Sequence, residues 1–114
     1  MFYSIPEIDV QELAVYLANK DSNVLLIDVR EPAEVAIACI DGFEIFPLSK
    51  FAQWSETLLN RMQSETEAIV MCHHGMRSAQ LCQWLMTKGI NNVKNVMGGI
   101  DAYSRFIDST VTRY

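Results

Sequence analysis

The sequence has few cysteines and histidines, and their spacing excludes two kinds of small domain. There are three cysteines and two histidines among 114 residues, and the cysteines at positions 39, 72 and 82 have no metal-binding spacing. Three cysteines cannot all pair with one another, so we expect free thiols in a reducing compartment. The cysteines therefore indicate neither a metal centre nor a disulfide framework.

Long apolar runs and an excess of basic charge are also lacking. No apolar run approaches the length of a membrane span, and residues 1–4 lack the basic flank and apolar segment of a signal peptide. Nine Lys and Arg residues stand against 14 Asp and Glu residues, for a net charge of −5. Binding of nucleic acid needs a basic face, so this charge argues against it. We expect a cytoplasmic protein that binds neither membranes nor nucleic acids.

The composition is that of a folded globular protein. Half of the residues are hydrophobic and 20% are charged, and 13.0 kDa is enough for one domain with a core, which we assign to residues 1–114. No linker, repeat or low-complexity segment interrupts the chain. Apolar runs of strand type alternate with helical patterns, which predicts an α/β fold with a mainly parallel central sheet and helices on both faces.

The boundaries of several helices can be predicted from local signals. Asp9 and Glu12 have the spacing of a capping box at a helix start. Pro32 suits the first turn of a short helix that ends at Ile37. Ser49 is a candidate cap for the next helix. The pattern predicts two further helices over 78–88 and 100–107, a turn over 21–23, a cap at residue 89, and strands over 24–27, 44–46, 68–71 and 93–96.

The segment from Cys72 to Ser78 carries the strongest functional signal. Cys72 follows the apolar run 68–71, a loop containing Gly75 comes next, and then a helix begins. Loop N–H groups and a helix N-terminus hold anions, so this environment would stabilise a thiolate. Ligands of parallel sheets bind at the carboxyl ends of strands, which is where Cys72 falls. We therefore predict a catalytic Cys72 rather than an inert buried thiol.

The other residues of this segment are predicted to bind the substrate. Gly75 suits a loop that curls its N–H groups inward. Arg77 pairs well with oxyanions, and we expect it to recognise an anionic donor. Ser78 is interpreted mainly as a helix cap, with a secondary role in substrate contact. The predicted substrate-binding residues are His73, His74, Gly75, Met76, Arg77 and Ser78.

We expect no metal at the two adjacent histidines. Side chains at neighbouring positions are expected to diverge, and the sequence offers no clustered further ligand. His73 and His74 are instead placed at the rim of the pocket, where an imidazole can attract anions.

Two other groups of residues are given structural roles. Asp28 and Arg30 are predicted to form structural ion pairs with neighbours such as Glu31 or Glu34. Cys82 lies on an apolar helical stripe and is predicted to be buried, and Cys39 to be partly buried.

Three motifs make the chain resemble a single-domain rhodanese of the short bacterial kind. Residues 72–78 match the family's C-x-x-G-x-R-[ST] loop, residues 28–34 match D-V-R-E-P-x-E, and residues 97–100 match the late G-G turn. The likeness spans nearly the whole chain. It departs at residues 38–43, where the family usually has G-H-I-P-G-A, and at Tyr103, where tryptophan is common.

The resemblance implies a sulfurtransferase without a cofactor, and we expect it to be monomeric. Cys72 would take a sulfane sulfur from thiosulfate or a similar donor as a persulfide, then release it to cyanide, a thiol or an acceptor protein. A persulfide relay between proteins is the alternative. A cysteine phosphatase or arsenate-reductase-like enzyme is disfavoured, because four residues separate Cys72 and Arg77, one fewer than in the C-x5-R phosphatase loop.

Overall fold

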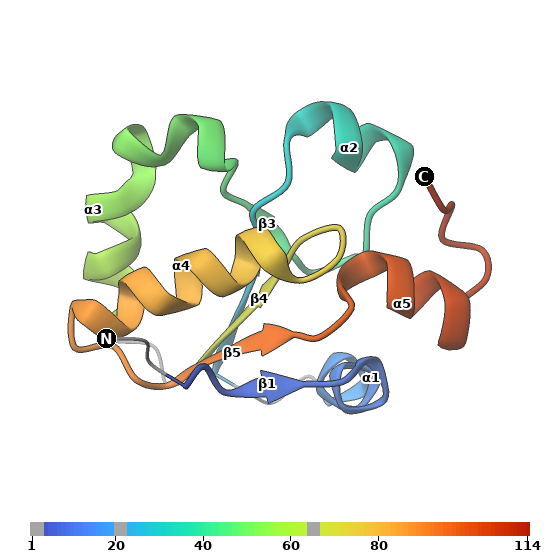
Figure 1. The fold of residues 1–114 in the computed structure, drawn as a ribbon, viewed down its shortest axis with the longest axis horizontal. Coiled ribbons are helices and arrows are strands. Elements are labelled where there is room, and N and C mark those ends of the chain that lie inside the picture. Colours follow the sequence, from blue (N-terminus) through green and yellow to red (C-terminus); the bar gives the residue numbers. More distant parts are fainter. Residues whose placement is uncertain (1–3, 20–22, 64–66) are drawn as a thin grey trace.

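The computed structural model describes residues 4–19, 23–63 and 67–114. Its centre is a parallel five-stranded sheet with strand order β1-β5-β4-β2-β3, shown in Figure 1. The strands are β1 (Glu7–Ile8), β2 (Val24–Asp28), β3 (Glu44–Ile45), β4 (Glu67–Met71) and β5 (Val93–Val96). The predicted α/β class is confirmed, and the edge strand β1 is an addition to the four predicted strands.

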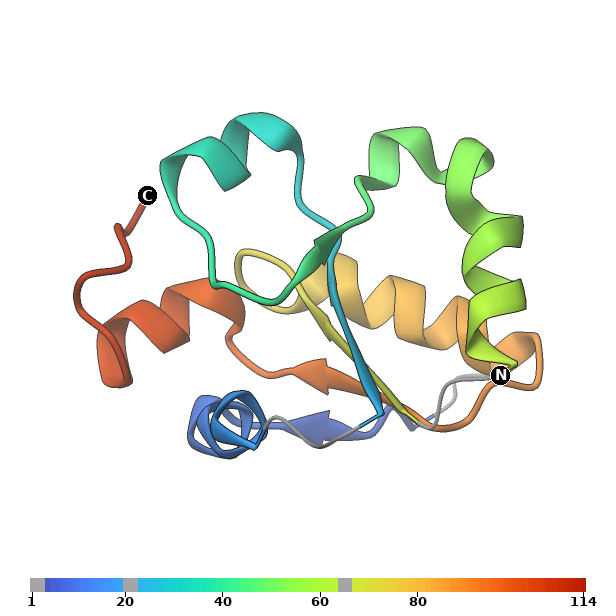
Figure 2. The ribbon, with the colours of Figure 1, turned by 180° about the vertical axis from the view of Figure 1, so that it is seen from behind.

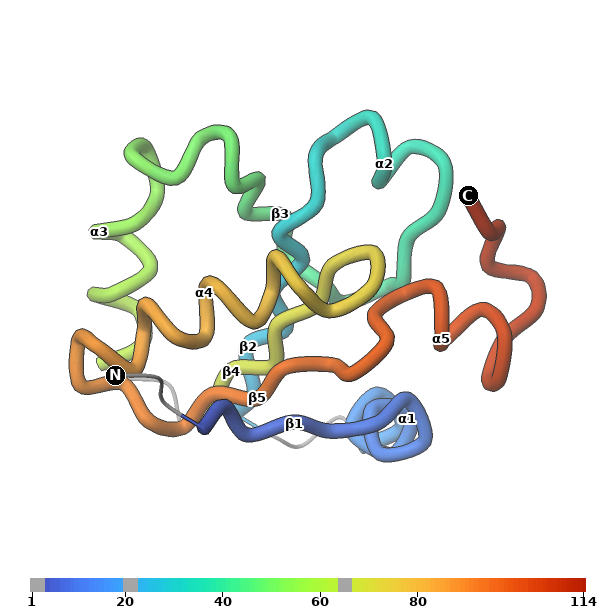
Figure 3. Tube along the Cα trace, viewed as in Figure 1, coloured from blue at the N-terminus to red at the C-terminus, as the bar shows by residue number. Residues whose placement is uncertain are grey.

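Within the described residues, five α-helices connect and cover the strands, and the chain can be followed through them in Figure 3. They are α1 (Val10–Ala18), α2 (Pro32–Ile37), α3 (Phe51–Met62), α4 (Met76–Thr87) and α5 (Gly99–Phe106), with a 3-10 turn at Leu48–Lys50 before α3. None of the described helices combines the length and the apolar composition that a membrane crossing requires. Of the turn predicted over 21–23, residues 21 and 22 lie outside the described residues.

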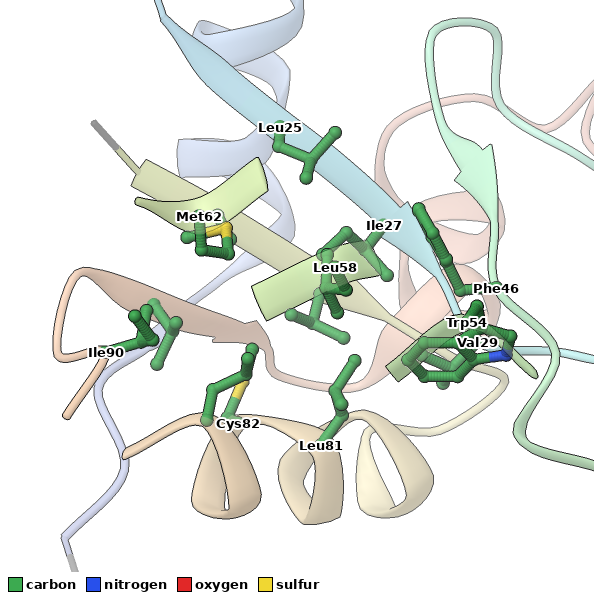
Figure 4. Close-up of a cluster of buried hydrophobic side chains, with 14 of the residues drawn as sticks. Leu25, Ile27, Val29, Phe46, Trp54, Leu58, Met62, Leu81, Cys82 and Ile90 are labelled. Atoms are coloured by element: carbon green, nitrogen blue, oxygen red, sulfur yellow. The ribbon is translucent and has the colours of Figure 1, made fainter. Parts of the chain in front are cut away.

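The two faces of the sheet bury separate cores. Helices α3 and α4 cover one face, where Figure 4 shows Leu58, Leu81 and Cys82 pointing towards Ile27 of β2. Helices α1 and α5 cover the other face, and the view from behind in Figure 2 shows both beside β1 and β5. Alternation along β4 sends Val70 to the first core and Met71 to the second. Cys72 continues this alternation and joins the first core.

Several predicted helix ends are confirmed. Asp9 and Glu12 form the capping box of α1, with Glu12 N–H donating to Asp9 Oδ1 at 2.8 Å. Helix α2 spans the predicted residues. Gly89 ends α4 with φ +84°, and the next N–H, from Ile90, donates to the carbonyl of Leu85 at 3.0 Å.

Two predicted serine caps are wrong. Ser49 lies inside the 3-10 turn, where its hydroxyl donates to Glu31, and Lys50 occupies the N-cap of α3. Helix α4 begins at Met76, two residues earlier than predicted, because Gly75 at φ +104° turns the chain directly into the helix. Ser78 therefore lies in the first turn of α4, and its hydroxyl is free for other partners.

Candidate active site

Cys72 lies at the carboxyl end of β4, enclosed by the first turn of α4. Its side chain is 1% exposed. The Gly75 N–H donates to Sγ at 3.1 Å, and the Ser78 hydroxyl contacts Sγ at 3.3 Å. The sulfur is thus buried, and the Gly75 N–H donated to it is a contact that stabilises negative charge on Sγ.

The N-terminus of α5 holds the other side of the loop. The Ile100 N–H donates to the carbonyl of Cys72 at 2.9 Å, and the Asp101 N–H donates to the carbonyl of His73 at 3.1 Å. Gly99 allows this approach, because a Cβ there would lie 2.4 Å from both of these carbonyl oxygens. The glycine pair before α5 therefore shapes the loop that carries the nucleophile.

Arg77 is already paired with a carboxylate. Its guanidinium binds Glu34 of α2 through two hydrogen bonds of 2.7 and 2.9 Å. Hydrogen bonding to Arg77 lowers the pKa of Glu34 to about 2. The side chain of Arg77 is 35% exposed, so an anionic donor could reach it only beside the Glu34 carboxylate. That Arg77 recognises the donor stays a prediction.

Asp28 and Arg30 form a buried ion pair with each other. The two side chains are 1% and 0% exposed and approach to 2.7 Å. Arg30 also donates to the carbonyls of Ala38 at 2.8 Å and of Glu34 at 3.4 Å. The structural role is confirmed, but the predicted partners are wrong, because a two-residue separation across the end of β2 lets Asp28 itself reach the guanidinium.

The histidines of the loop form an aromatic stack. The ring of His73 lies 3.8 Å from that of Tyr114 with 6° between the planes, and 3.9 Å from that of His74. The expectation that the two imidazoles diverge is therefore wrong, because the tight loop turns both rings to one side. Burial, followed by the neighbouring His74, lowers the pKa of His73.

The stack also brings potential metal ligands together. Ligand atoms of His73, His74 and Asp101 lie within 4.8 Å of one another, the only such group of three or more among the described residues. The Nε2 atom of His73 is buried and has no hydrogen-bond partner in the part of the chain that the structure describes. Asp101, however, is paired with Arg113 at 3.2 Å. These three side chains are the ones that could hold a metal ion, and the absence of a metal stays a prediction.

The other two thiols differ from each other. Cys82 is fully buried, as predicted, and burial raises the pKa of its thiol to about 12. Cys39 is exposed, and the expected partial burial is wrong, because it follows the short helix α2, none of whose residues is buried.

Three residues around the loop were missed by reasoning from the sequence. Glu34 was assigned only to an ion pair near its own helix, and Tyr114 to nothing, because both act on residues distant in the sequence. Asn95 is a buried amide in β5 beside the loop. A polar residue inside the predicted strand 93–96, next to Val96, was the available signal for Asn95. Met76 of the predicted set is 77% exposed.

The fold and the cysteine loop define a class of small α/β proteins, and comparison with known proteins identifies the family. A sequence model of the Rhodanese-like domain matches residues 9–106. A sulfurtransferase of Allochromatium vinosum is 33% identical over 101 residues, which cover 89% of this chain and 90% of the relative. The chain belongs to the rhodanese-like domain family, and a sulfurtransferase-type family is supported.

One relative is a longer protein, and a solved structure of similar length has the same fold. Rhodanese-like/PpiC domain-containing protein 12 of Arabidopsis thaliana, a chloroplastic protein, is 42% identical over 89 residues, 78% of this chain, but the match covers 30% of that protein. The crystal structure of a rhodanese-like domain protein from Staphylococcus aureus is similar, with a TM-score of 0.73 and 28% identity over 87% of this chain and 91% of that one.

Proposed function

We propose that this chain transfers a sulfane sulfur from thiosulfate or a similar donor to a thiophilic acceptor through a persulfide on Cys72. In the first half-reaction the Cys72 thiolate attacks the outer sulfur of thiosulfate. A new S–S bond forms, the S–S bond of the donor breaks, and sulfite leaves with the electron pair. The product is a persulfide anion on Cys72, so charge and electrons balance.

The second half-reaction regenerates the thiolate. Cyanide attacks the terminal sulfur of the persulfide, the S–S bond to Cys72 breaks, and thiocyanate leaves. In this proposal the Gly75 N–H stabilises negative charge on Sγ before the first transfer and after the second. No step requires a redox partner or a metal.

One observation carries this proposal: a buried sulfur at a strand end accepts the Gly75 N–H and lies against the Ser78 hydroxyl. The test is thiocyanate formation from thiosulfate and cyanide. We expect ping-pong kinetics, loss of activity in Cys72→Ser and retention in the matched control Cys39→Ser, whose thiol is exposed. Full activity in Cys72→Ser would overturn the proposal.

A persulfide relay to an acceptor protein is the second candidate, and the exposure of Met76 favours it. This side chain is 77% exposed at the start of α4, next to the loop. An apolar side chain at that place suits contact with another protein, whereas cyanide needs no such contact. Mass spectrometry separates the two candidates: in a relay, the added sulfur leaves Cys72 for an acceptor protein, and Met76→Ala slows that step more than it slows thiocyanate formation.

A further inference from the structure

A single buried amide organises the surroundings of the nucleophile. Asn95 of β5 is 1% exposed, and all its amide hydrogens and its carbonyl are used. Nδ2 donates to the carbonyl of Gly75 and to a carboxylate oxygen of Glu7, both at 3.0 Å. Oδ1 accepts from the Ser78 hydroxyl at 2.5 Å. A rotated amide would turn Oδ1 towards two other acceptors, so Glu7 and Gly75 fix its orientation.

The two loop residues that Asn95 holds are the ones that contact the sulfur. Gly75 donates to Cys72 Sγ through its N–H, and Asn95 binds the carbonyl of the same residue. Ser78 contacts Sγ through its hydroxyl, and Asn95 binds that hydroxyl. One side chain from a different strand therefore sets the position of both hydrogen-bonding groups at the nucleophile.

We propose that Asn95 is a positioning residue for the Cys72 thiolate and persulfide, and that Glu7 orients its amide from the edge strand β1. The Ser78 hydroxyl has one hydrogen, which Asn95 Oδ1 accepts at 2.5 Å, so the Gly75 N–H is the donor to Sγ and Asn95 acts on the sulfur by holding the Gly75 carbonyl. Asn95 is 1% exposed, and burial makes each of these bonds stronger than it would be in water. Only the kinetic test of this inference rests on the proposed sulfur transfer.

Asn95→Ala tests whether the amide acts on the chemical step. Asn95 contacts no exposed part of the loop, so we expect kcat for sulfur transfer to fall by about ten- to a hundredfold, the range for losing hydrogen bonds to a charged group. KM for thiosulfate should change by less than about twofold, since the variant leaves untouched the binding that is equally strong in the ground state and the transition state. Asn91→Ala, at an exposed asparagine before β5, is the matched control. An unchanged kcat, or a loss confined to KM, would overturn the proposal.

A charge exchange tests the role of Glu7 and separates positioning from packing. Asn95→Asp keeps the shape of the side chain but puts a carboxylate oxygen against Glu7 and the carbonyl of Gly75. Glu7→Gln alone can still accept from Asn95, so we expect near wild-type kcat. In the double variant the new amide at position 7 can donate to the new carboxylate, and we expect kcat to recover by at least about fivefold over Asn95→Asp. No recovery in a folded double variant would refute the role of Glu7.

Alkylation separates this inference from the proposed function. Iodoacetamide reacts with the Cys72 thiolate without any sulfur donor, and peptide mass mapping distinguishes its label from those of Cys39 and Cys82. We expect slower Cys72 alkylation at neutral pH in Asn95→Ala than in wild type, while the other side chains around the loop are unchanged.

If the wild type fails to form thiocyanate but this difference holds, the proposed function falls and the positioning role stands. Equal alkylation rates would refute positioning. If Asn95→Ala does not fold, Asn95→Asp and the double variant carry the same comparison, with slower alkylation expected in Asn95→Asp and recovery in the double variant.

Discussion

Replacing Gly99 with alanine should test the contact between the N-terminus of α5 and the Cys72 loop. A control at Gly89 measures the backbone strain that alanine has at positive φ. A Cβ at this residue would lie 2.4 Å from the carbonyl oxygens of Cys72 and His73, and the backbone has φ +60°. Gly89 provides the matched control, because it has φ +84° and a Cβ there would meet nothing within 4 Å. Both variants acquire left-handed strain, and only Gly99→Ala also pushes against the loop.

The expected magnitudes differ between the two variants. A left-handed conformation of a residue with a Cβ costs about 1–2 kcal/mol, which is the whole effect expected for Gly89→Ala. Gly99→Ala must also move α5 away from the loop. It would then weaken the two N–H donations from Ile100 and Asp101, of 2.9 and 3.1 Å. At about 0.5–1.5 kcal/mol each, these bonds bring the expected loss to roughly 2–5 kcal/mol.

Urea unfolding of the wild type and both variants measures these losses directly. Cys72 alkylation and thiocyanate formation report on the loop in the same samples. We expect Gly89→Ala to retain the wild-type rates and Gly99→Ala to lower both. Equal destabilisation in the two variants, with equal rates at Cys72, would show that the contact between α5 and the loop is unimportant and would refute this reasoning.

Three further outcomes are expected. Because Arg77 lowers the pKa of Glu34 from 4.5 to about 2, their pair stabilises the fold above pH 4.5 and this stability is lost as the pH falls. In urea unfolding Glu34→Gln should therefore cost about 1 kcal/mol near neutrality, allowing for solvent screening, and almost nothing at the acid end, and a constant difference would contradict this. Cys82 should be alkylated only as the protein unfolds, because burial raises its pKa to about 12, and labelling of the native state would argue against that burial. In Tyr114→Ala the pKa of His73, measured by NMR titration, should rise towards 6.5 because the ring that buries it is gone, and an unchanged titration would show that Tyr114 contributes no burial.

Local signals in the sequence predicted much of the fold. The capping box at Asp9, the start of α2 at Pro32 and the end of α4 at Gly89 each depend on residues within a few positions. The apolar runs predicted β2 and β4 because strands covered on both faces are apolar throughout. The position of Cys72 at a strand end followed from the same runs.

What could not be predicted depends on contacts between distant parts of the chain. Strand β1 has only two residues and exists through pairing with β5. One of the two serines misassigned as caps, Ser78, has its partners in Cys72 at the end of β4 and Asn95 of β5. Arg77 and Glu34 are 43 positions apart, so the sequence alone did not indicate that the guanidinium is already neutralised.

The pairing of β1 with β5 has a consequence for the order of events during protein synthesis. Glu7 and Asn95 are 88 positions apart, and β5 lies between β1 and β4 in the sheet. Strands β2 and β4 can pair while the ribosome is still making the remainder, but the gap between β1 and β4 stays open until β5 emerges. The amide that fixes Gly75 and Ser78, and the N–H groups that bind the loop carbonyls, arrive only then. A growing chain would therefore carry Cys72 as an ordinary thiol, and the nucleophile would acquire its reactivity when the last strand closes the sheet.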